Sequence, residues 1–267
     1  MAWHFPVSQR AYQQQVIHSP LRILHISDPH LHASRDARMR GVNTDASLVA
    51  SLEHAFADLH RPDLILATGD LVQDESRQGY ERFRELVGKP GIPVHCLPGN
   101  HDSLSAMQAV LSDAPFRFCG INDYPPWRLI MLNSKMDDND GGLISAPELE
   151  RLQQALTTHR DGYVLVALHH QPIAMDSCWL DTVGLRNADD FLALIDMHPQ
   201  VRAIVWGHVH QASDRLRKGV RLISTPSTCA QFLPGAENFS LDSRPPGYRW
   251  LDLYPDGTMQ TSVVWVE

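Results

Sequence analysis

Residues 21–30 read LRILHISDPH, a short apolar run that ends abruptly in the polar triplet Asp28-Pro29-His30. The run predicts a β-strand over residues 21–27, because it is short and rich in aliphatic side chains. Ligand sites in α/β sheets lie beyond the carboxyl ends of the strands. Asp28 and His30 stand at such an end, and side chains two residues apart in an extended segment point to the same side. The stretch therefore predicts both a strand and one edge of a site.

Four more predicted strands end in the same manner, with carboxylate, amide or imidazole side chains soon after the apolar run. They cover residues 63–68 before Gly69-Asp70, 92–97 before Gly99-Asn100-His101-Asp102, 163–168 before His169-His170, and 201–206 before Gly207-His208-Val209-His210. The glycines allow the tight strand-to-loop turns that a shared cavity requires. We expect the five strand ends to converge on a single site.

The rest of the pattern alternates helices with strands and then becomes rich in strands, which predicts an α/β protein. Helical periodicity covers residues 44–59, 76–86, 104–111, 146–159 and 188–197, with Thr44 as the predicted N-cap of the first helix. Further strands are predicted at residues 128–133, 215–217, 221–224, 248–254 and 259–266, and a long loop at 235–247. Because no linker or internal repeat divides the chain, we expect one domain over residues 21–267 after an N-terminal arm at residues 1–20.

The composition argues against several classes of function. The chain has 267 residues, with 23 Lys and Arg against 31 Asp and Glu, and a net charge of −8. Such an acidic chain is a poor non-specific binder of nucleic acid or of anionic membranes. No apolar run approaches the roughly 18 residues of a membrane span, and no signal-peptide pattern opens the sequence. We therefore expect a cytoplasmic protein, with its four widely spaced cysteines reduced.

The side chains at the strand ends have the chemistry of metal ligands. Aspartate, asparagine and histidine offer oxygen and imidazole nitrogen atoms, a set that suits Mn, Fe, Zn or Co better than Mg, Ca or Cu(I). The seven expected ligands are Asp28, His30, Asp70, Asn100, His169, His208 and His210. Seven are too many for one tetrahedral site, whereas a bridging carboxylate can serve two ions. Two ions roughly 3.5–4 Å apart form a clamp for in-line displacement at phosphorus, and they would also neutralise a phosphate bound to an acidic chain.

The order of these motifs, D-x-H, G-D, G-N-H-D, H and G-H-x-H, resembles that of the calcineurin-like metallophosphoesterase superfamily. Other segments are similar to the bacterial class III 3′,5′-cyclic AMP phosphodiesterases, and the resemblance runs from about residue 21 to the C-terminus. These segments are GVNT (41–44), ATGDLVQD (67–74), CWLD (178–181), LRNA (185–188), TPSTCAQF (225–232) and PGYR (246–249).

The resemblance implies a four-layer αββα sandwich, in which helices flank two mixed β-sheets. It also implies two divalent metal ions in each chain, with Asp70 bridging them. The ligands of one ion, usually iron in this group, would be Asp28, His30 and His210. The ligands of the second ion, often manganese, would be Asn100, His169 and His208.

Two points about the metals stay open in the sequence. His169 is favoured over His170 as the ligand because it follows the strand directly, but either histidine would fit the motif. Zinc and cobalt are alternatives to iron and manganese, since the same oxygen and nitrogen ligands suit them.

The resemblance further implies a reaction. A hydroxide that bridges the two ions would attack the phosphorus of 3′,5′-cyclic AMP in line, and the product would be 5′-AMP. His101 would face the scissile phosphate and either donate a proton to the O3′ leaving group or stabilise it by a hydrogen bond. We expect Asp102 to orient the His101 ring.

The substrate would be a small-molecule cyclic nucleotide. The residues expected to contact it at the phosphate are His30, Asp70, Asn100, His101 and His210. Adenine needs contacts elsewhere, because the sequence contains no nucleotide motif such as G-x-G-x-x-G. Trp179 and residues 228–232 are the candidates for this base pocket.

Two other functions are compatible with the sequence. The same chemistry could act on a broader range of substrates, such as 2′,3′-cyclic nucleotides, glycerophosphodiesters or phosphomonoesters. A non-catalytic scaffold would retain the fold, but it is disfavoured because all seven expected ligands are present. The oligomeric state is open, with a homodimer as one option.

Overall fold

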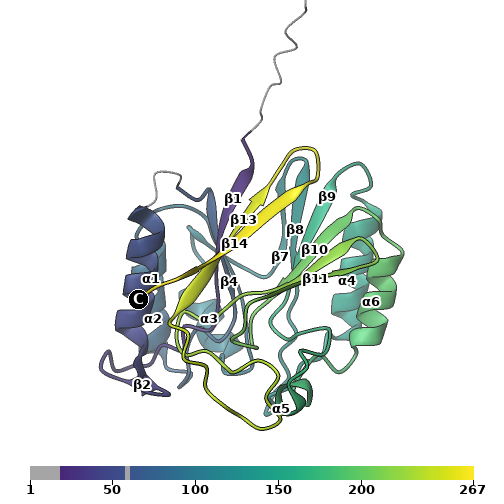
Figure 1. The fold of residues 1–267 in the computed structure, drawn as a ribbon. Helices are drawn as coiled ribbons and strands as arrows, with labels where there is room; N and C mark the ends of the chain where they lie inside the picture. The colour runs from purple at the N-terminus through teal and green to yellow at the C-terminus, as the bar shows by residue number, and fades with distance from the viewer. Residues whose placement is uncertain (1–18, 58–60) are drawn as a thin grey trace, which may run out of the picture.

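Two six-stranded β-sheets form the centre of the molecule (Figure 1). The computed structural model describes residues 19–57 and 61–267. In spatial order, the first sheet contains β14 (Met259–Trp265), β13 (Gly247–Leu253), β1 (Leu21–Ile26), β4 (Leu64–Thr68), β5 (Val94–Leu97) and β6 (Phe116–Phe118). The second sheet contains β11 (Ser213–Arg217), β12 (Val220–Ser224), β10 (Val201–Trp206), β9 (Tyr163–Ala167), β8 (Trp127–Met131) and β7 (Gly120–Tyr124).

Both sheets are mixed, with a parallel centre and antiparallel edges. In the first sheet β1, β4, β5 and β6 are parallel, while β13 is antiparallel to β1 and β14 is antiparallel to β13. In the second sheet β8, β9, β10 and β12 are parallel, while β7 and β11 are antiparallel edge strands. The carboxyl ends of the parallel strands within each sheet therefore lie along one edge, which is the arrangement that a shared site requires.

Helices cover the outer faces of both sheets (Figure 1). On the first sheet lie α1 (Thr44–Ala57), α2 (Arg77–Gly88) and α3 (Leu104–Val110), and on the second lie α4 (Ala146–Thr157) and α6 (Ala188–Asp196). The short helix α5 (Cys178–Asp181) lies at the bottom of Figure 1, below the two sheets. This arrangement confirms the predicted four-layer αββα sandwich.

The alternation of side chains along the strands builds three buried layers. Leu24 of β1 and Ile65 of β4 face the helices, whereas Ile23 and Leu66 of the same strands face the second sheet. Because both faces are covered, β4 is buried along its whole length. Its sequence LILAT is accordingly apolar without interruption, as central parallel strands usually are.

Most predicted elements are present, and the differences have simple causes. The predicted N-cap Thr44 is wrong: it is the first residue of α1, and the Asn43 side chain accepts a hydrogen bond from the Ala46 N–H, as an N-cap does. The sequence did not predict α5, the short strands β6 and β7, or the two-residue strands β2 (Arg38–Met39) and β3 (Val42–Asn43). α5, β2, β3 and β6 are too short to show a periodicity, and β7, with the sequence GINDY, contains no apolar run.

Part of two predictions lies outside the described residues. These are residues 1–18 of the predicted arm and the last two residues of the helix predicted over 44–59. Within the described part, no helix is both long and apolar enough to cross a bilayer. The four cysteines all lie in that part and are free thiols there.

Candidate metal centre

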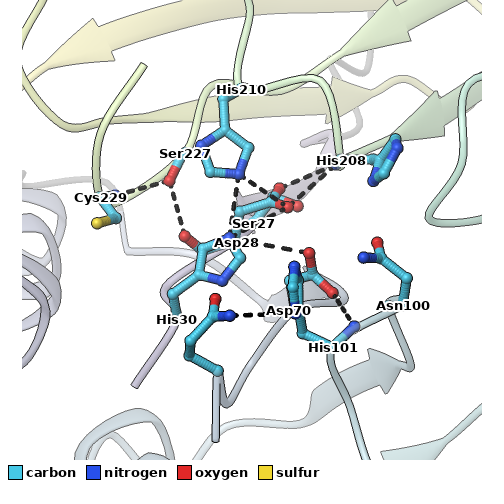
Figure 2. A network of polar contacts seen from close by, with 12 residues as sticks. Ser27, Asp28, His30, Asp70, Asn100, His101, His208, His210, Ser227 and Cys229 are labelled. Atoms are coloured by element: carbon cyan, nitrogen blue, oxygen red, sulfur yellow. Dashed lines mark hydrogen bonds and ion pairs between the residues drawn. The ribbon is translucent and has the colours of Figure 1, made fainter. Parts of the chain in front are cut away.

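The five predicted strand ends meet at one place, and Figure 2 labels residues from four of them, namely Asp28, Asp70, Asn100 and His208. Three groups of side chains offer ligand atoms within 4.8 Å of one another, and every member is buried. The groups are Asp28, His30 and His210; Asp28, Asp70 and His169; and His169, His170 and His208. The first sheet supplies the two carboxylates and His30, and the second sheet supplies the other histidines.

Asp70 lies between the two halves of the site. Its carboxylate is 3.4 Å from the Nε2 of His169 and 3.8 Å from the Nε2 of His30. On one side, Asp28 lies 3.4 Å from the Nε2 of His210. On the other, the side-chain oxygen of Asn100 lies 3.1 Å from the Nε2 of His169. Asp70 therefore has the position that a carboxylate shared by two ions would need.

Backbone carbonyls fix the protonation of three of the histidine rings. His169 donates its Nδ1–H to the Thr68 carbonyl at 2.7 Å, and His210 donates its Nδ1–H to the Ala230 carbonyl at 2.6 Å. His208 donates its Nε2–H to the carbonyl of Val183 at 3.1 Å. A carbonyl can only accept, so the opposite nitrogen of each ring can keep a free lone pair. Metal-binding histidines in proteins have this pattern of second contacts.

The charges of the site also suit a cation. Burial raises the pKa of Asp70, but His169 and His30 outweigh it and hold that pKa well below its usual range. Burial likewise opposes ionisation of Asp28, and His210 overcomes it and lowers the pKa. In return, Asp70 raises the pKa of His169 to about 9 against the effect of burial. The two carboxylates thus keep their negative charge although they are buried, which suits the binding of divalent cations.

Five of the seven expected ligands have left-handed backbone conformations. Their φ angles are positive although none is glycine: Asp28 (53°), His30 (47°), Asp70 (50°), His208 (65°) and His210 (47°). This region is disfavoured for residues with a Cβ atom and is retained mainly where the surroundings impose it, often at functional sites. The positions of these side chains are therefore set by the fold rather than by local preference.

The glycines of the motifs are required by close approach as well as by turns. Gly69 has a φ of +92°, which agrees with the expected turn. At Gly207 the constraint is space, because an added Cβ would lie 1.9 Å from the Ser27 Oγ and 2.7 Å from an Asp28 carboxylate oxygen. Here the two sheets touch, and the Asp28 carboxylate accepts the backbone N–H of His208 at 3.0 Å. Figure 2 shows this contact beside Asp70 and Asn100.

His101 lies in the cleft, but its partner differs from the one expected. The prediction that Asp102 orients the His101 ring is wrong, because the Asp102 carboxylate accepts hydrogen bonds from the backbone N–H groups of Leu71, Val72 and Gly99 and from the Tyr80 hydroxyl. Burial, together with the charge of Asp70, raises the pKa of Asp102 to about 6. Asp102 thus ties the loop after β4 to the loop after β5.

The side chain that does contact the His101 ring is Gln73. Its amide lies 3.1 Å from the His101 Nδ1, while the His101 backbone N–H donates to Asp70 at 2.9 Å. Sequence reasoning missed Gln73 as a site residue. The only signal for Gln73 was its place in the segment ATGDLVQD, which as a whole resembles the cyclic AMP phosphodiesterases.

The structure separates the environments of His169 and His170. The Nε2 of His169 faces both Asp70 and Asn100, whereas His170 forms a hydrogen bond with the Ser134 hydroxyl through its Nδ1 at 2.8 Å. The His170 ring packs against His208, with ring centroids 4.8 Å apart. These contacts favour His169 as the ligand and His170 as its neighbour.

A cleft of about 620 Å³ opens above these groups. His30, Asp70, Asn100 and His101 line its floor, and Trp179 of α5 lines its wall together with Phe232 and Phe239. Trp179 meets both phenylalanines edge to face, and Phe232 stacks on His210 with centroids 4.0 Å apart. The structure therefore brings Trp179 and Phe232 to the cleft.

The other residues of the 228–231 segment support the site from behind. They are buried, the Thr228 N–H donates to the Ser27 carbonyl, and the Ala230 carbonyl holds His210. Of the segment proposed for the base pocket, only its last residue, Phe232, lines the cleft.

Comparisons with known proteins agree with this geometry. The family model described as calcineurin-like phosphoesterase matches residues 21–212. The 3′,5′-cyclic adenosine monophosphate phosphodiesterase CpdA of Pseudomonas aeruginosa is 39% identical over 241 residues, which cover 90% of this chain and 88% of that protein. CpdA of Escherichia coli K12 is 40% identical over 246 residues, which cover 91% of this chain and 89% of that protein.

Solved structures show the same fold at low identity. A dimetal phosphatase from Danio rerio has a TM-score of 0.63 at 15% identity and covers 92% of this chain and 99% of its own. The purple acid phosphatase PPD1 from yellow lupin seeds has a TM-score of 0.64 at 13% identity and covers 92% of this chain and 54% of its own. Both likenesses concern the arrangement of the sheets and helices.

The contact at Gly207 leads to a first prediction. Gly207→Ala should lower the free energy of unfolding by about 1–3 kcal/mol, the usual cost of overpacking, and should also reduce the Mn²⁺ retained by the chain, because it pushes His208 away from Asp28. Denaturant unfolding and elemental analysis measure the two effects.

The control is Gly219→Ala, in the turn between β11 and β12. Gly219 has a φ of +86°, but an added Cβ meets no atom within 4 Å. It should cost about 1–2 kcal/mol from backbone strain alone and leave Mn²⁺ retention unchanged. Full metal retention by Gly207→Ala would contradict the close-approach argument.

Proposed function

This chain belongs to the calcineurin-like phosphoesterase family, and on that basis we propose that it hydrolyses 3′,5′-cyclic AMP to 5′-AMP with two divalent metal ions. The observation that carries the proposal is the set of three buried ligand groups beside the cleft, in which the Asp70 carboxylate faces both His30 and His169. Two relatives with about nine-tenths of their length matched are named as cyclic AMP phosphodiesterases. An acidic protein needs cations at such a site to accept an anionic substrate.

The proposed ligands follow the two halves of the site. Asp28, His30 and His210 would hold one ion, and Asn100, His169 and His208 the other, with Asp70 serving both. The support is the grouping of these ligand atoms, the carbonyl contacts of three rings, and the ionised state of both aspartates. Iron and manganese are the proposed pair, with zinc or cobalt as alternatives that the same ligands accept.

The mechanism assigns distinct tasks to the residues of this chain. When bound, the pair of ions supplies Lewis acidity and a nucleophile at neutral pH. His101 lines the cleft and is held through its Nδ1 by the Gln73 side chain, which leaves the Nε2–H to face the O3′ leaving group, where it would donate a hydrogen bond or, from the imidazolium form, a proton. Asp102 contributes by holding the loops that carry Asp70 and Asn100 rather than by touching His101.

The proposed substrate contacts fall into two regions of the cleft. His30, Asp70, Asn100, His101 and His210 lie at the floor, where the phosphate would bind. Trp179 lies on the aromatic wall and would stack on adenine. A cleft of about 620 Å³ lies in the usual range for small-molecule sites.

We extend the proposal to the chain as a whole. Residues 21–267 would form one domain, which is supported by a buried cluster that contains Ile23 and Leu66 of the first sheet with Leu165 and Val205 of the second. The cytoplasmic location and the homodimer stay predictions.

The role of Asp70 can be tested by metal analysis. Asp70→Ala should abolish activity and lower the occupancy of both metal positions, because its carboxylate faces both halves of the site. Asn100→Ala, the control, should weaken mainly the position next to His169. Two full equivalents of metal in purified Asp70→Ala would rule out the shared carboxylate.

The role of His101 can be separated from metal binding. His101→Ala should retain both ions and lose roughly 10²–10⁴-fold in kcat for cyclic AMP, the usual size of general-acid catalysis. The loss should shrink for a p-nitrophenyl diester, whose leaving group departs without a proton.

The matched control is His32→Ala, which removes another histidine that lines the same cleft. It should change kcat little on either substrate. An equal loss of kcat on both substrates in His101→Ala would indicate a binding role for that residue.

The substrate itself is tested by turnover on a panel of 3′,5′- and 2′,3′-cyclic nucleotides with Mn²⁺ and Fe²⁺ supplied. We expect 3′,5′-cyclic AMP to have the highest kcat/KM. A preference for 2′,3′-cyclic nucleotides, or equal turnover of all diesters, would favour the broader phosphodiesterase instead.

The same panel tests the base pocket. Stacking on an aromatic side chain contributes about 1–3 kcal/mol per base, so Trp179→Ala should lower kcat/KM for cyclic AMP by roughly 5- to 150-fold on that range. A small diester such as bis(p-nitrophenyl) phosphate should be affected much less. If both substrates fall equally, Trp179 only packs against Phe232 and Phe239.

A further inference from the structure

A fully buried histidine, His25, lies in β1 between the two sheets, just behind the metal centre. It occupies the same face of the strand as Ile23, where the neighbouring side chains are apolar. Its Nε2 lies 2.8 Å from the Thr68 hydroxyl, and its Nδ1 lies 2.6 Å from the Thr225 hydroxyl. Thr68 ends β4 of the first sheet, and Thr225 follows β12 of the second. The ring therefore connects the two sheets that supply the expected ligands.

The hydrogen bonds around His25 run in one direction. The Ser27 hydroxyl donates to the Thr68 carbonyl at 3.3 Å, so the Thr68 hydroxyl is the donor to Ser27 at 2.7 Å. With that proton used, the Thr68 oxygen can only accept from the Nε2–H of His25. The Nδ1 of His25 must then accept from Thr225. Every polar group in this run of hydrogen bonds has a partner, and only one tautomer of His25 is compatible with these directions.

His25 is held neutral, as this chain of hydrogen bonds requires. Burial lowers the pKa of His25 to about 3, and the nearby Arg249 guanidinium adds to the effect. A neutral imidazole offers one donor and one acceptor, which are the two roles assigned above. If this position served packing alone, an aliphatic residue would avoid the cost of burying polar atoms.

The run of hydrogen bonds ends at the Thr68 carbonyl, which contacts the metal centre. The Thr68 carbonyl that accepts from Ser27 is the same carbonyl that accepts the Nδ1–H of His169 at 2.7 Å. We propose that His25 is a positioning residue for the metal centre, which holds Thr68 so that its carbonyl fixes the orientation and tautomer of His169. The inference rests on the proposed role of His169 as a ligand. Contacts of this kind typically change metal affinity by 10- to 100-fold when they are lost.

The structure contains a matched control in His95 of β5. The two histidines are in register on either side of Leu66, since His25 pairs with Leu66 and Leu66 pairs with His95. His95 is also fully buried, and its Nε2 bonds to the Tyr124 hydroxyl of the second sheet at 2.6 Å. Both residues thus join the two sheets, but the His95 ring bonds to Tyr124 rather than to Thr68 or His169.

The experiment measures metal affinity and does not depend on turnover. The full chain and its variants are loaded with Mn²⁺ alone, a chelator is titrated, and the Mn²⁺ retained is measured by elemental analysis. His25→Leu should weaken one of the two Mn²⁺ positions by about 10- to 100-fold. His25→Gln should stay within a few fold of the wild type, because an amide also offers one donor and one acceptor. His95→Leu should lose stability but keep wild-type Mn²⁺ affinity.

A second variant covers the case in which His25→Leu fails to fold. Thr68→Val keeps the carbonyl and the shape of the side chain but removes the hydroxyl, so it should weaken the same Mn²⁺ position. In the double variant with His25→Leu, where that chain folds, the two losses should not add, because both changes act on the same run of hydrogen bonds.

Two results would overturn the inference. One is wild-type Mn²⁺ affinity in both His25→Leu and Thr68→Val, and the other is an equal loss of affinity in His25→Leu and His95→Leu. Failure of the proposed function would look different, because the wild-type chain would then bind fewer than two Mn²⁺ or would bind both without cleaving cyclic AMP.

Discussion

The contact between the Asp28 carboxylate and the backbone N–H of His208 is the point on which the site depends. Asp28 ends a strand of the first sheet and His208 ends a strand of the second, and both oxygens of the carboxylate lie within 3.1 Å of that nitrogen. The contact is reachable only because residue 207 has no side chain. Two further hydrogen bonds hold Asp28 in place: its backbone N–H donates to the Gly69 carbonyl, and its own carbonyl accepts from the Ser227 hydroxyl. One residue thus joins the two sheets and also presents a charge to the centre.

The negative charge of the molecule and of its site opposes the binding of an anionic phosphate. The chain carries an excess of acidic residues, and its metal centre contains two buried carboxylates, of which Asp70 lines the cleft. An anion can enter such a place only when cations are already there. Under the proposed function, the protein would bind phosphate through its ions, while its own side chains would hold those ions and shape the aromatic wall. Discrimination between phosphodiesters would then depend on the wall, because the ions bind all phosphates alike.

Most of the strands and helices, and the meeting of the strand ends at one place, could be predicted from the sequence, since each depends on a local pattern. An apolar run that is followed by Asp28 or by His208 predicts both a strand and the place where it ends. Gln73 and Asp102 could not be assigned in this way, because their partners are chosen by the approach of separate loops. Asp102 follows His101 in the chain, which suggested a contact, yet its carboxylate turns toward the backbone after β4.

The role of His25 was hidden for the same reason. In sequence it is one polar residue in an apolar strand, and only the fold brings Thr68 and Thr225 to its two nitrogens. The glycine at position 207 was noticed but explained by turn geometry, whereas the structure requires it for the approach of the two sheets.

The left-handed backbone of five expected ligands has a consequence for how this fold can diverge. Glycine adopts that conformation without penalty, whereas Asp28, His30, Asp70, His208 and His210 each pay about 1–2 kcal/mol at most for keeping a side chain there. Glycine at these positions would remove that backbone cost, but it would also remove the buried contacts of the side chains, such as the one between Asp28 and the His208 N–H that joins the two sheets. The fold therefore retains these side chains for their contacts as well as for the metal.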